Sequence, residues 1–293
     1  MLYVEFCVEL RAVCLDFYNQ GHYCLEIMIT TLKEVWLRRE LLWILVVRNL
    51  KLRYKHSALG FFWSLLSPLL LILIYAVFAA ILKFNDGRPN YLQFLVIGIV
   101  VWQFLSMCLN DSLYAIMGNT NLVKKTSFPR IILPLAMVIS NLLNFLLTWI
   151  VLFAYLVWMG MPFQHLELLP VILLIQTVLC LGLALLLSSL NVFFRDTEHI
   201  LGVGTLAWFF MSPIFYPISM QQGFLPEKFA WMAFLNPMSG IIWGYRRLLM
   251  GDKMPDVAVP LYYLAVSAAV CFIVLGIGFA TFQKLQARFG DEL

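Results

Sequence analysis

Residues 119–130 (NTNLVKKTSFPR) are the segment whose residue types best suit contact with a partner. The segment carries Lys124, Lys125 and Arg130, and it contains the pair Phe128-Pro129. A short helix here would present Phe128 as an apolar anchor for a groove on another protein, as aromatic hot spots do. An ordinary basic loop beside a membrane has the same composition. On the spacing of these residues alone, the two interpretations are equally good.

The chain lacks the patterns of common catalytic and nucleotide-binding sites. It has no G-x-x-x-x-G-K-[ST], no H-E-x-x-H and no G-x-S-x-G motif. Its 6 cysteines show no metal-ligand spacing, and its 4 histidines are scattered. We therefore expect a protein that is not an enzyme, without catalytic residues, a metal site or a cofactor of its own.

Composition indicates that lipid surrounds much of the chain. Its 293 residues are 62% hydrophobic and 12% charged, whereas soluble domains are about 45–50% apolar and about 25% charged. A soluble fold of this length cannot bury so much apolar surface. The sequence thus predicts an all-α membrane protein.

Six apolar runs approach the roughly 20 residues that a membrane helix needs. The fifth is interrupted by Pro213 and Pro217. We predict six transmembrane helices at residues 61–82, 91–115, 131–158, 168–194, 200–220 and 257–282.

The stretch between the last two runs has a different pattern. Residues 229–245 are apolar and aromatic, but Asn236-Pro237 interrupts them and Arg246-Arg247 follows. This segment is too short and too broken to span. We expect a re-entrant helical pair, because irregular backbone at membrane depth must be buried in protein.

Residues 41–56 alternate apolar with basic side chains. This pattern predicts an N-terminal amphipathic helix in the membrane interface. Residues 1–40 form an extension of unknown role, and residues 41–293 a transmembrane domain. With both termini cytoplasmic, 14 of the 20 lysines and arginines fall on the inside. The positive-inside rule therefore favours that orientation.

Few ionisable residues lie within the predicted spans. Asp111 is the acidic residue well inside one, and its neighbours Asn110 and Ser112 favour a satisfied polar cluster over a functional site. The relays of proton- or sodium-driven carriers need several such groups. A transporter that has neither such a relay nor a nucleotide-binding motif must take its energy from a separate protein. Residues 119–130 are the segment on which we expect that protein to dock.

Aromatic residues make up 15% of the chain. The flat C–H faces of sugars pack on such rings, so a path for a sliding polymer is one interpretation. A belt at the membrane interfaces is the alternative, and it is favoured for Trp63, Trp102, Trp208 and Trp243. Residues better suited to line a path are Tyr75, Phe209, Phe210, Phe215 and Tyr216.

Five ordered stretches carry a family resemblance. They are RNLKLRYKHSALGFFWSLLSPLLLILIY (48–75), NLVKKTSFPRIILP (121–134), LNVFFRDTEHI (190–200), SPIFYP (212–217) and NPMSGIIWGYRRLLMG (236–251). From about residue 41 onward, the chain resembles the permease subunit of ABC-2 type exporters for O-antigen, capsular polysaccharide and teichoic acid. Asn49 departs from the pattern, since many relatives have Asp there.

The resemblance implies a permease homodimer in the inner membrane, with two separate ATPase subunits that bind ATP and magnesium. Its cargo would be a lipid-linked polysaccharide, with membrane lipids as further partners and no nucleic acid. The alternative cargo is a small hydrophobic drug or a lipo-oligosaccharide. A membrane glycosyltransferase is disfavoured, because the loops offer only scattered acidic residues.

The resemblance also assigns roles to residues. Coupling to the ATPase would involve Asn121, Lys124, Lys125, Thr126, Ser127, Phe128, Pro129 and Arg130, with Arg195 and Asp196 nearby. A cytoplasmic gate helix would contain Arg48, Lys51, Arg53, Tyr54 and Lys55. An outward gate would contain Asn236, Pro237, Tyr245 and Arg246.

Overall fold

The computed structural model describes residues 30–55, 62–82, 90–126, 128–194, 196–223, 227–255, 259 and 262–293. Within these ranges the chain is helical and contains no strand. The prediction of an all-α membrane protein is confirmed at this level by four helices that are long and apolar enough to cross a membrane.

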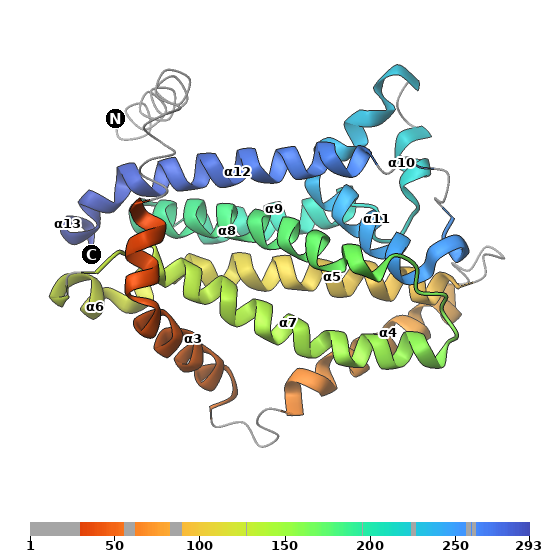
Figure 1. The fold of residues 1–293 in the computed structure, drawn as a ribbon, viewed down its shortest axis with the longest axis horizontal. Coiled ribbons are helices and arrows are strands. Elements are labelled where there is room, and N and C mark those ends of the chain that lie inside the picture. The colour runs from red at the N-terminus through yellow and green to blue at the C-terminus, as the bar shows by residue number, and fades with distance from the viewer. Residues whose placement is uncertain are drawn as a thin grey trace.

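These four helices run side by side along the length of the molecule (Figure 1). They correspond to the second, third, fourth and sixth predicted spans. They are α5 (Tyr91–Leu113), α7 (Ile132–Trp158), α8 (Leu169–Phe193) with the preceding turn η3 (Leu166–Leu168), and α12 (Tyr263–Leu285).

The other two predicted spans also contain helices. Helix α4 (Trp63–Leu82) has 20 residues and packs on α5 and α7. Helix α9 (Thr197–Met211) has only 15 residues, and the chain leaves helical geometry before α10 (Ile218–Gly223). Pro213 explains the break, because proline lacks the N–H and its ring clashes with the preceding turn.

The segment between α10 and α12 is an irregular pair of helices. It consists of η4 (Glu227–Leu235) and α11 (Pro237–Met250), followed by the turn η5 (Gly251–Lys253). Helix α11 is buried on nearly every side and packs on α5, α8 and α12. Such burial is what backbone outside a long spanning helix needs at membrane depth.

Several shorter helices gather at the end of the bundle that lies opposite α10 and α11, which we call the α6 end (Figure 1). They are α3 (Arg39–Tyr54), η2 (Met117–Asn119), α6 (Thr120–Lys125), η6 (Gln286–Arg288) and α13 (Phe289–Glu292). Helix α3 runs across the long helices and packs on α7. Leu45 and Val46 are buried there, while Trp43 and Ile44 remain exposed.

The core has two parts. The larger part lies among α5, α7, α8 and α11, and the smaller part lies at the α6 end.

The close approach of α8 to α12 depends on two glycines. A Cβ atom at Gly182 would lie 2.7 Å from the Leu275 backbone, and a Cβ at Gly278 would collide with the Gly182 carbonyl. Small residues allow this kind of helix contact in membranes, where packing holds helices together.

Candidate functional site

Helix α6 presents a basic surface at the α6 end. Val123 is buried and fixes the helix on the protein, whereas Asn121, Lys124 and Lys125 are exposed. The exposed Thr126 closes the helix, since its Oγ1 donates a hydrogen bond to the Leu122 carbonyl at 2.6 Å. The segment thus has the short helix that the sequence predicts for docking.

The residues after α6 turn back onto the chain. Phe128 and Pro129 are half-buried, and Phe128 packs against the smaller core. Arg130 donates a hydrogen bond to the Gln286 carbonyl, and its guanidinium lies 5.9 Å from the Phe289 ring centroid. Phe128 and Arg130 therefore have contacts within this chain that the sequence did not predict. Ser127 lies outside the described residues.

The start of α9 lies near the end of α5. The exposed Tyr114, the residue that follows α5, lies within hydrogen-bonding reach of the Glu198 carboxylate of α9. Asp196 precedes α9 and is exposed. Its predicted companion Arg195 lies outside the described residues.

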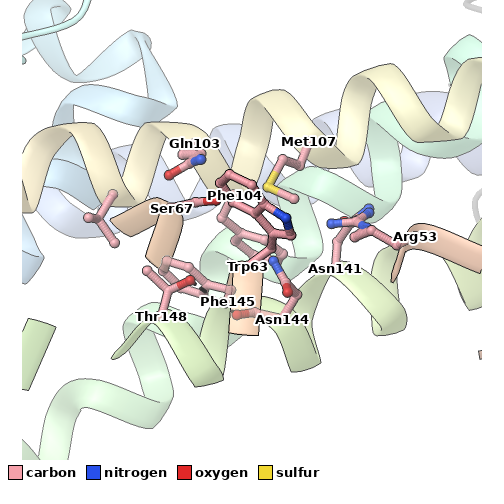
Figure 2. A pocket seen from close by; sticks show the side chains of 11 residues that line it. Arg53, Trp63, Ser67, Gln103, Phe104, Met107, Asn141, Asn144, Phe145 and Thr148 are labelled. Carbon is pink, nitrogen blue, oxygen red and sulfur yellow. Dashed lines mark hydrogen bonds between the residues drawn. The ribbon is translucent and has the colours of Figure 1, made fainter. Parts of the chain in front are cut away.

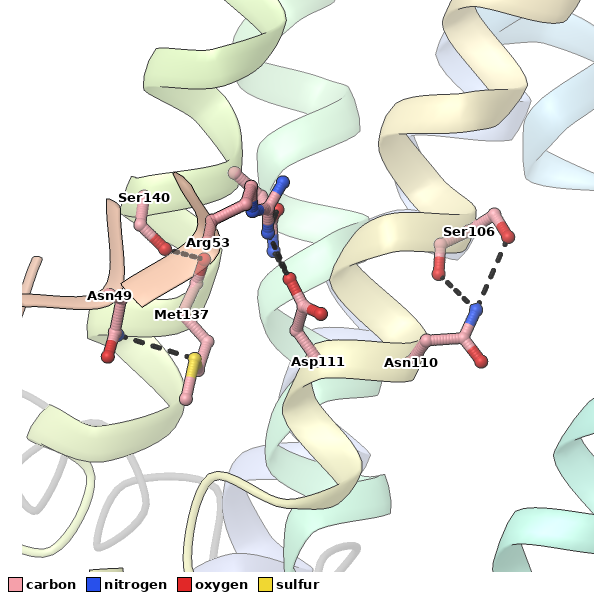
Figure 3. Close-up of polar contacts among 8 residues, drawn as sticks. Asn49, Arg53, Ser106, Asn110, Asp111, Met137 and Ser140 are labelled. Carbon is pink, nitrogen blue, oxygen red and sulfur yellow. Dashed lines mark hydrogen bonds and ion pairs between the residues drawn. The ribbon is translucent and has the colours of Figure 1, made fainter. Parts of the chain in front are cut away.

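Arg53 joins three helices through one polar cluster (Figure 3). Its Nη2 forms an ion pair with Asp111 of α5 and donates a hydrogen bond to Asn141 Oδ1 of α7 at 2.6 Å. The Asn141 amide in turn donates to Asp111 Oδ2 at 2.9 Å. Arg53 thereby fixes the end of α3 on α5 and α7.

Asp111 is thus in a satisfied polar cluster, but its partners differ from the predicted ones. Asn110 turns away and donates to the Ser106 carbonyl at 2.7 Å (Figure 3). Arg53 lies 58 positions from Asp111 in the sequence, and nothing in local spacing links two such distant residues.

The other predicted gate residues occupy different surroundings. Asn49 donates to the Met137 sulfur at 3.3 Å, so this departure from the family pattern lies at the contact of α3 with α7. Arg48 contacts the Asn49 side chain at 3.3 Å, and Lys51 and Lys55 are exposed. Tyr54 lies within α3, and its side chain is outside the described part.

A cavity of about 260 Å³ adjoins the Arg53 cluster (Figure 2). Side chains of α4, α5 and α7 surround it, and Arg53 lines one side. The polar and aromatic lining residues are Arg53, Trp63, Ser67, Gln103, Phe104, Asn141, Asn144, Phe145 and Thr148.

The sequence analysis missed most of this lining, although a signal was present. Asn141, Asn144 and Thr148 recur at intervals of three and four in an otherwise apolar run, which places them on one helix face. Polar groups at such depth are costly, so a polar stripe indicates either protein contact or a functional cavity.

The predicted path aromatics form a cluster around the break after α9. The Phe209 ring lies 5.3 Å from the rings of both Phe210 and Phe215, and Phe210 stacks on Phe215 at 6.1 Å. The Tyr216 hydroxyl donates to the Phe210 carbonyl at 3.0 Å. Phe210 is exposed. Tyr75 lies in α4, and its side chain is outside the described part.

The tryptophan belt prediction is wrong for two residues. Trp102 and Trp243 are buried inside the protein, where they cannot meet lipid headgroups. Trp102 packs edge-on against Trp208 at 5.8 Å, and Trp243 packs on Phe234 at 6.4 Å. Trp243 lies in α11, and the packing of this helix against the rest of the protein buries it.

Arg246 of α11 is buried and bonded to backbone. It donates to the carbonyls of Phe94 (3.0 Å), Pro213 (2.5 Å) and Ile214 (2.8 Å), and it lies 3.3 Å from the Phe94 ring centroid. The guanidinium thus donates both to the Pro213 and Ile214 carbonyls at the proline break and to the Phe94 carbonyl of α5. It thereby holds the break against α5. Tyr245 beside it is also buried and packs on Trp149 at 5.2 Å.

Asn236 links the same regions from the start of α11. Its Oδ1 accepts from the Met238 amide (3.1 Å) and from the Trp208 indole (2.8 Å), and its Nδ2 donates to Ser212 Oγ (3.1 Å). It therefore caps α11, which Pro237 begins, and also attaches it to α9. The four predicted outward-gate residues lie in α11 or at its start, and the structure gives them anchoring contacts.

Comparison with known proteins identifies the family. The model of the ABC-2 type transporter family matches residues 40–250. The chain is 34% identical to the O-antigen export system permease protein RfbA of Klebsiella pneumoniae over 257 residues, which cover 87% of this chain and 95% of that protein. It is 34% identical to the protein of the same name from Myxococcus xanthus, over 91% of this chain and 100% of that protein. The polysialic acid transport protein KpsM of Escherichia coli is 24% identical over 83% and 92% of the two chains. This chain belongs to the ABC-2 type transporter family.

Proposed function

We propose that the chain is the permease subunit of an ATP-driven exporter that moves a lipid-linked polysaccharide, such as O-antigen, across the inner membrane. A separate subunit hydrolyses ATP. The observation that carries this proposal is the similarity over nearly the full length to two O-antigen export permeases. The similarity to a polysialic acid transport protein from a third organism also supports a glycan cargo.

The finer topology belongs to the same proposal. Six spans follow if α4 and the broken α9–α10 segment cross the membrane together with the four long helices. Helices η4 and α11 then form the re-entrant pair, and the buried Arg246 supports this, because it satisfies backbone carbonyls at the break. Both termini are cytoplasmic, residues 41–293 form the transmembrane domain, and residues 1–40 are an extension of it.

The α6 end is the proposed cytoplasmic face. The exposed side chains of Asn121, Lys124, Lys125 and Thr126 form the coupling surface for the ATPase, together with Asp196, Arg195, Ser127, Pro129 and the open side of Phe128. Arg130 orders this surface through its contacts with the C-terminal segment. Two permease copies bind two ATPase subunits, which hold the ATP and magnesium.

Helix α3 is the proposed gate helix. Its basic residues Arg48, Lys51 and Lys55 meet the lipid-linked substrate at the membrane surface, and Arg53 holds the helix against α5 and α7. Asp111 lies near the end of α5 that leads into α6. Motion of the coupling surface therefore reaches α3 through Asp111 and Arg53. The aromatics at the α9 break line the path, and Asn236, Pro237, Tyr245 and Arg246 support the outward gate.

The proposal is tested by deleting the gene for this chain in its host. We expect surface polysaccharide to disappear while the lipid-linked polymer accumulates in the cytoplasm, and a plasmid copy should restore the surface polymer. A control deletion of a glycosyltransferase removes the polymer from both places. Normal surface polysaccharide with increased sensitivity to hydrophobic drugs would contradict the proposal and favour the alternative cargo.

A second measurement tests the coupling surface. The double variant Lys124→Glu/Lys125→Glu should reverse the charge of α6 without disturbing the core, since both side chains are exposed. We expect loss of export and loss of ATPase co-purification, with normal amounts of permease in the membrane. Matched replacement of the exposed Lys253, at the other end of the molecule, should leave both intact. Retention of the ATPase by the α6 variant would contradict the assignment.

A further inference from the structure

The cavity beside Arg53 has the chemistry of a ligand site that none of the roles above requires. Faces of three helices converge on it (Figure 2). Asn141, Asn144 and Thr148 come from α7, Gln103 from α5 and Ser67 from α4. Amide and hydroxyl groups both donate and accept hydrogen bonds. The cavity can therefore match a ligand that carries many hydroxyl groups.

Aromatic rings supply the second component of the site. Phe104 and Phe145 stack with ring centroids 4.6 Å apart and form one wall. Trp63 lies among the labelled side chains of Figure 2 and keeps 40% of its surface exposed, so it stands at the rim. Rings beside amides suit a sugar, whose C–H faces pack on aromatic surfaces while its hydroxyls bond to polar groups.

The charges argue against an anionic ligand. Arg53 is the one charged residue among the described lining residues, and its Nη2 is already paired with the Asp111 carboxylate. A phosphate would have to compete with that carboxylate for the guanidinium. Arg53 Nη1 is buried and has no hydrogen-bond partner among the described residues. This N–H can donate to a neutral hydroxyl without breaking the ion pair.

An apolar ligand fits less well. No hydrogen bond is found for the Gln103 amide within the described part of the chain. A hydrocarbon in the cavity would leave this amide and Arg53 Nη1 unsatisfied, and unpaired polar groups in an apolar environment cost free energy. The volume of about 260 Å³ is below the roughly 300–1,000 Å³ of pockets for drug-sized ligands. One sugar ring fits this space better than an oligosaccharide.

We propose that this cavity is a subsite for one neutral sugar residue of the exported polymer, bound between α4, α5 and α7. Trp63 and the Phe104–Phe145 pair pack on the ring, while Gln103, Asn144 and Arg53 Nη1 bond to its hydroxyls. The subsite depends on the proposed polysaccharide cargo. It lies next to the Arg53–Asp111 pair, so a bound sugar would contact Arg53, the residue that holds the gate helix α3 in place.

Photo-cross-linking in exporting cells tests contact with the glycan. Benzoylphenylalanine is placed at Trp63 or, in a second variant, at Met107, which also lines the cavity. After irradiation and denaturing purification, the permease is probed for glycan. We expect glycan on both variants and none with the probe at Leu73, an exposed position on the same helix α4. Absence of glycan at both cavity positions in cells that still export overturns the subsite and leaves the proposed function intact.

Binding measurements separate the ligand classes. The probes are a neutral oligosaccharide fragment of the exported polymer and a polyprenyl phosphate, both added to the complete transporter in nanodiscs. Saturation-transfer NMR reports binding of the fragment. Gln103→Leu should weaken it by roughly 2- to 10-fold, the effect of one hydrogen bond. Gln93→Leu, on α5 but outside the cavity lining, should leave it unchanged. Equal binding by both variants, or complete displacement of the fragment by the phosphate lipid, would overturn the assignment to a neutral sugar.

Discussion

Two arginines fix helices at opposite ends of the molecule in different ways. Arg246 is 2% exposed and donates to three backbone carbonyls. The Arg53 side chain is 23% exposed, and its ion-pair partner Asp111 is 37% exposed. One side chain is enclosed by backbone, whereas the other pairs with a side chain that water can reach.

The difference indicates what each contact can do. The three hydrogen bonds of Arg246 to these carbonyls are buried, so breaking them costs the full desolvation of several groups. An ion pair that is partly exposed can exchange its partner for water at little cost. Arg246 is therefore suited to hold the α9 break permanently, and Arg53 is suited to a contact that opens and closes.

The largest expected effect follows from removal of Arg246. Arg246→Met leaves the Pro213 and Ile214 carbonyls without the guanidinium, and each buried unpaired group costs about 1–3 kcal/mol. We expect destabilisation of several kcal/mol, measured by thermal unfolding of the purified permease with fluorescence-detected size exclusion.

The adjacent Arg247 is the matched control. Its guanidinium lies 3.7 Å from Asp252, whose side chain is 72% exposed. The Arg247 side chain is itself 27% exposed, so Arg247→Met should change stability by at most about 1 kcal/mol, as is usual for pairs that are partly exposed. Equal destabilisation by the two variants would remove the distinction between the enclosed arginine and its neighbour.

A smaller effect is expected at Gly98, which makes room for Arg246. A Cβ at this position would lie 2.5 Å from Arg246 Nη2. Gly98→Ala should force the guanidinium off its carbonyls and cost about 1–3 kcal/mol, as overpacking does. Gly202→Ala on α9 meets open space and should be neutral or stabilising by up to about 1 kcal/mol. The melting temperature of the Gly98→Ala variant should therefore be the lower of the two. A lower melting temperature for Gly202→Ala would mean that the close packing of Gly98 on Arg246 does not limit stability.

The sequence predicts the helices at these two ends better than the contacts of their arginines. Hydrophobic runs locate most of the spans, and Pro213 predicts the break after α9, since both signals are local. The partners of Arg246 could not be predicted, because they are backbone atoms of two other segments. Nor could those of Arg53, since Asp111 and Asn141 are 58 and 88 positions away. For the same reason Trp102 and Trp243 were assigned to the lipid interface, although tertiary packing buries them.

The Arg53–Asp111 pair should show a modest effect on stability and a larger one on export. Asp111→Arg or Arg53→Asp places like charges together, while the double exchange restores opposite charges between α3 and α5. We expect a destabilisation of about 1 kcal/mol for each single variant, typical of a pair that is partly exposed, and recovery in the double variant. Export of polysaccharide should fall in both single variants and recover partly in the double variant.

Lys51→Asp on the exposed side of α3 is the control, and it should leave stability unchanged. Full export by the Asp111→Arg variant would contradict the role of the pair in moving the gate helix. Destabilisation of the double variant beyond the sum of the single variants would show that the Asn141 contact depends on which helix carries the arginine.

The smallest expected effect is that of Arg53→Lys, and comparison with Arg246→Lys isolates the geometry of the guanidinium. Lysine has one ammonium group, whereas arginine has a planar fork of five donors. A single ammonium can still pair with Asp111, because the pair uses only Nη2 of Arg53. We expect a change in stability of at most about 0.5 kcal/mol, the range of tolerated surface substitutions.

At position 246, the three carbonyls are bonded by three different nitrogens of the guanidinium, so the one ammonium group of a lysine cannot replace them. Thermal unfolding should therefore separate the two lysine variants clearly. Equal melting temperatures would mean that Arg246 acts through its charge alone, and the contrast between an enclosed and an exchangeable arginine would no longer hold.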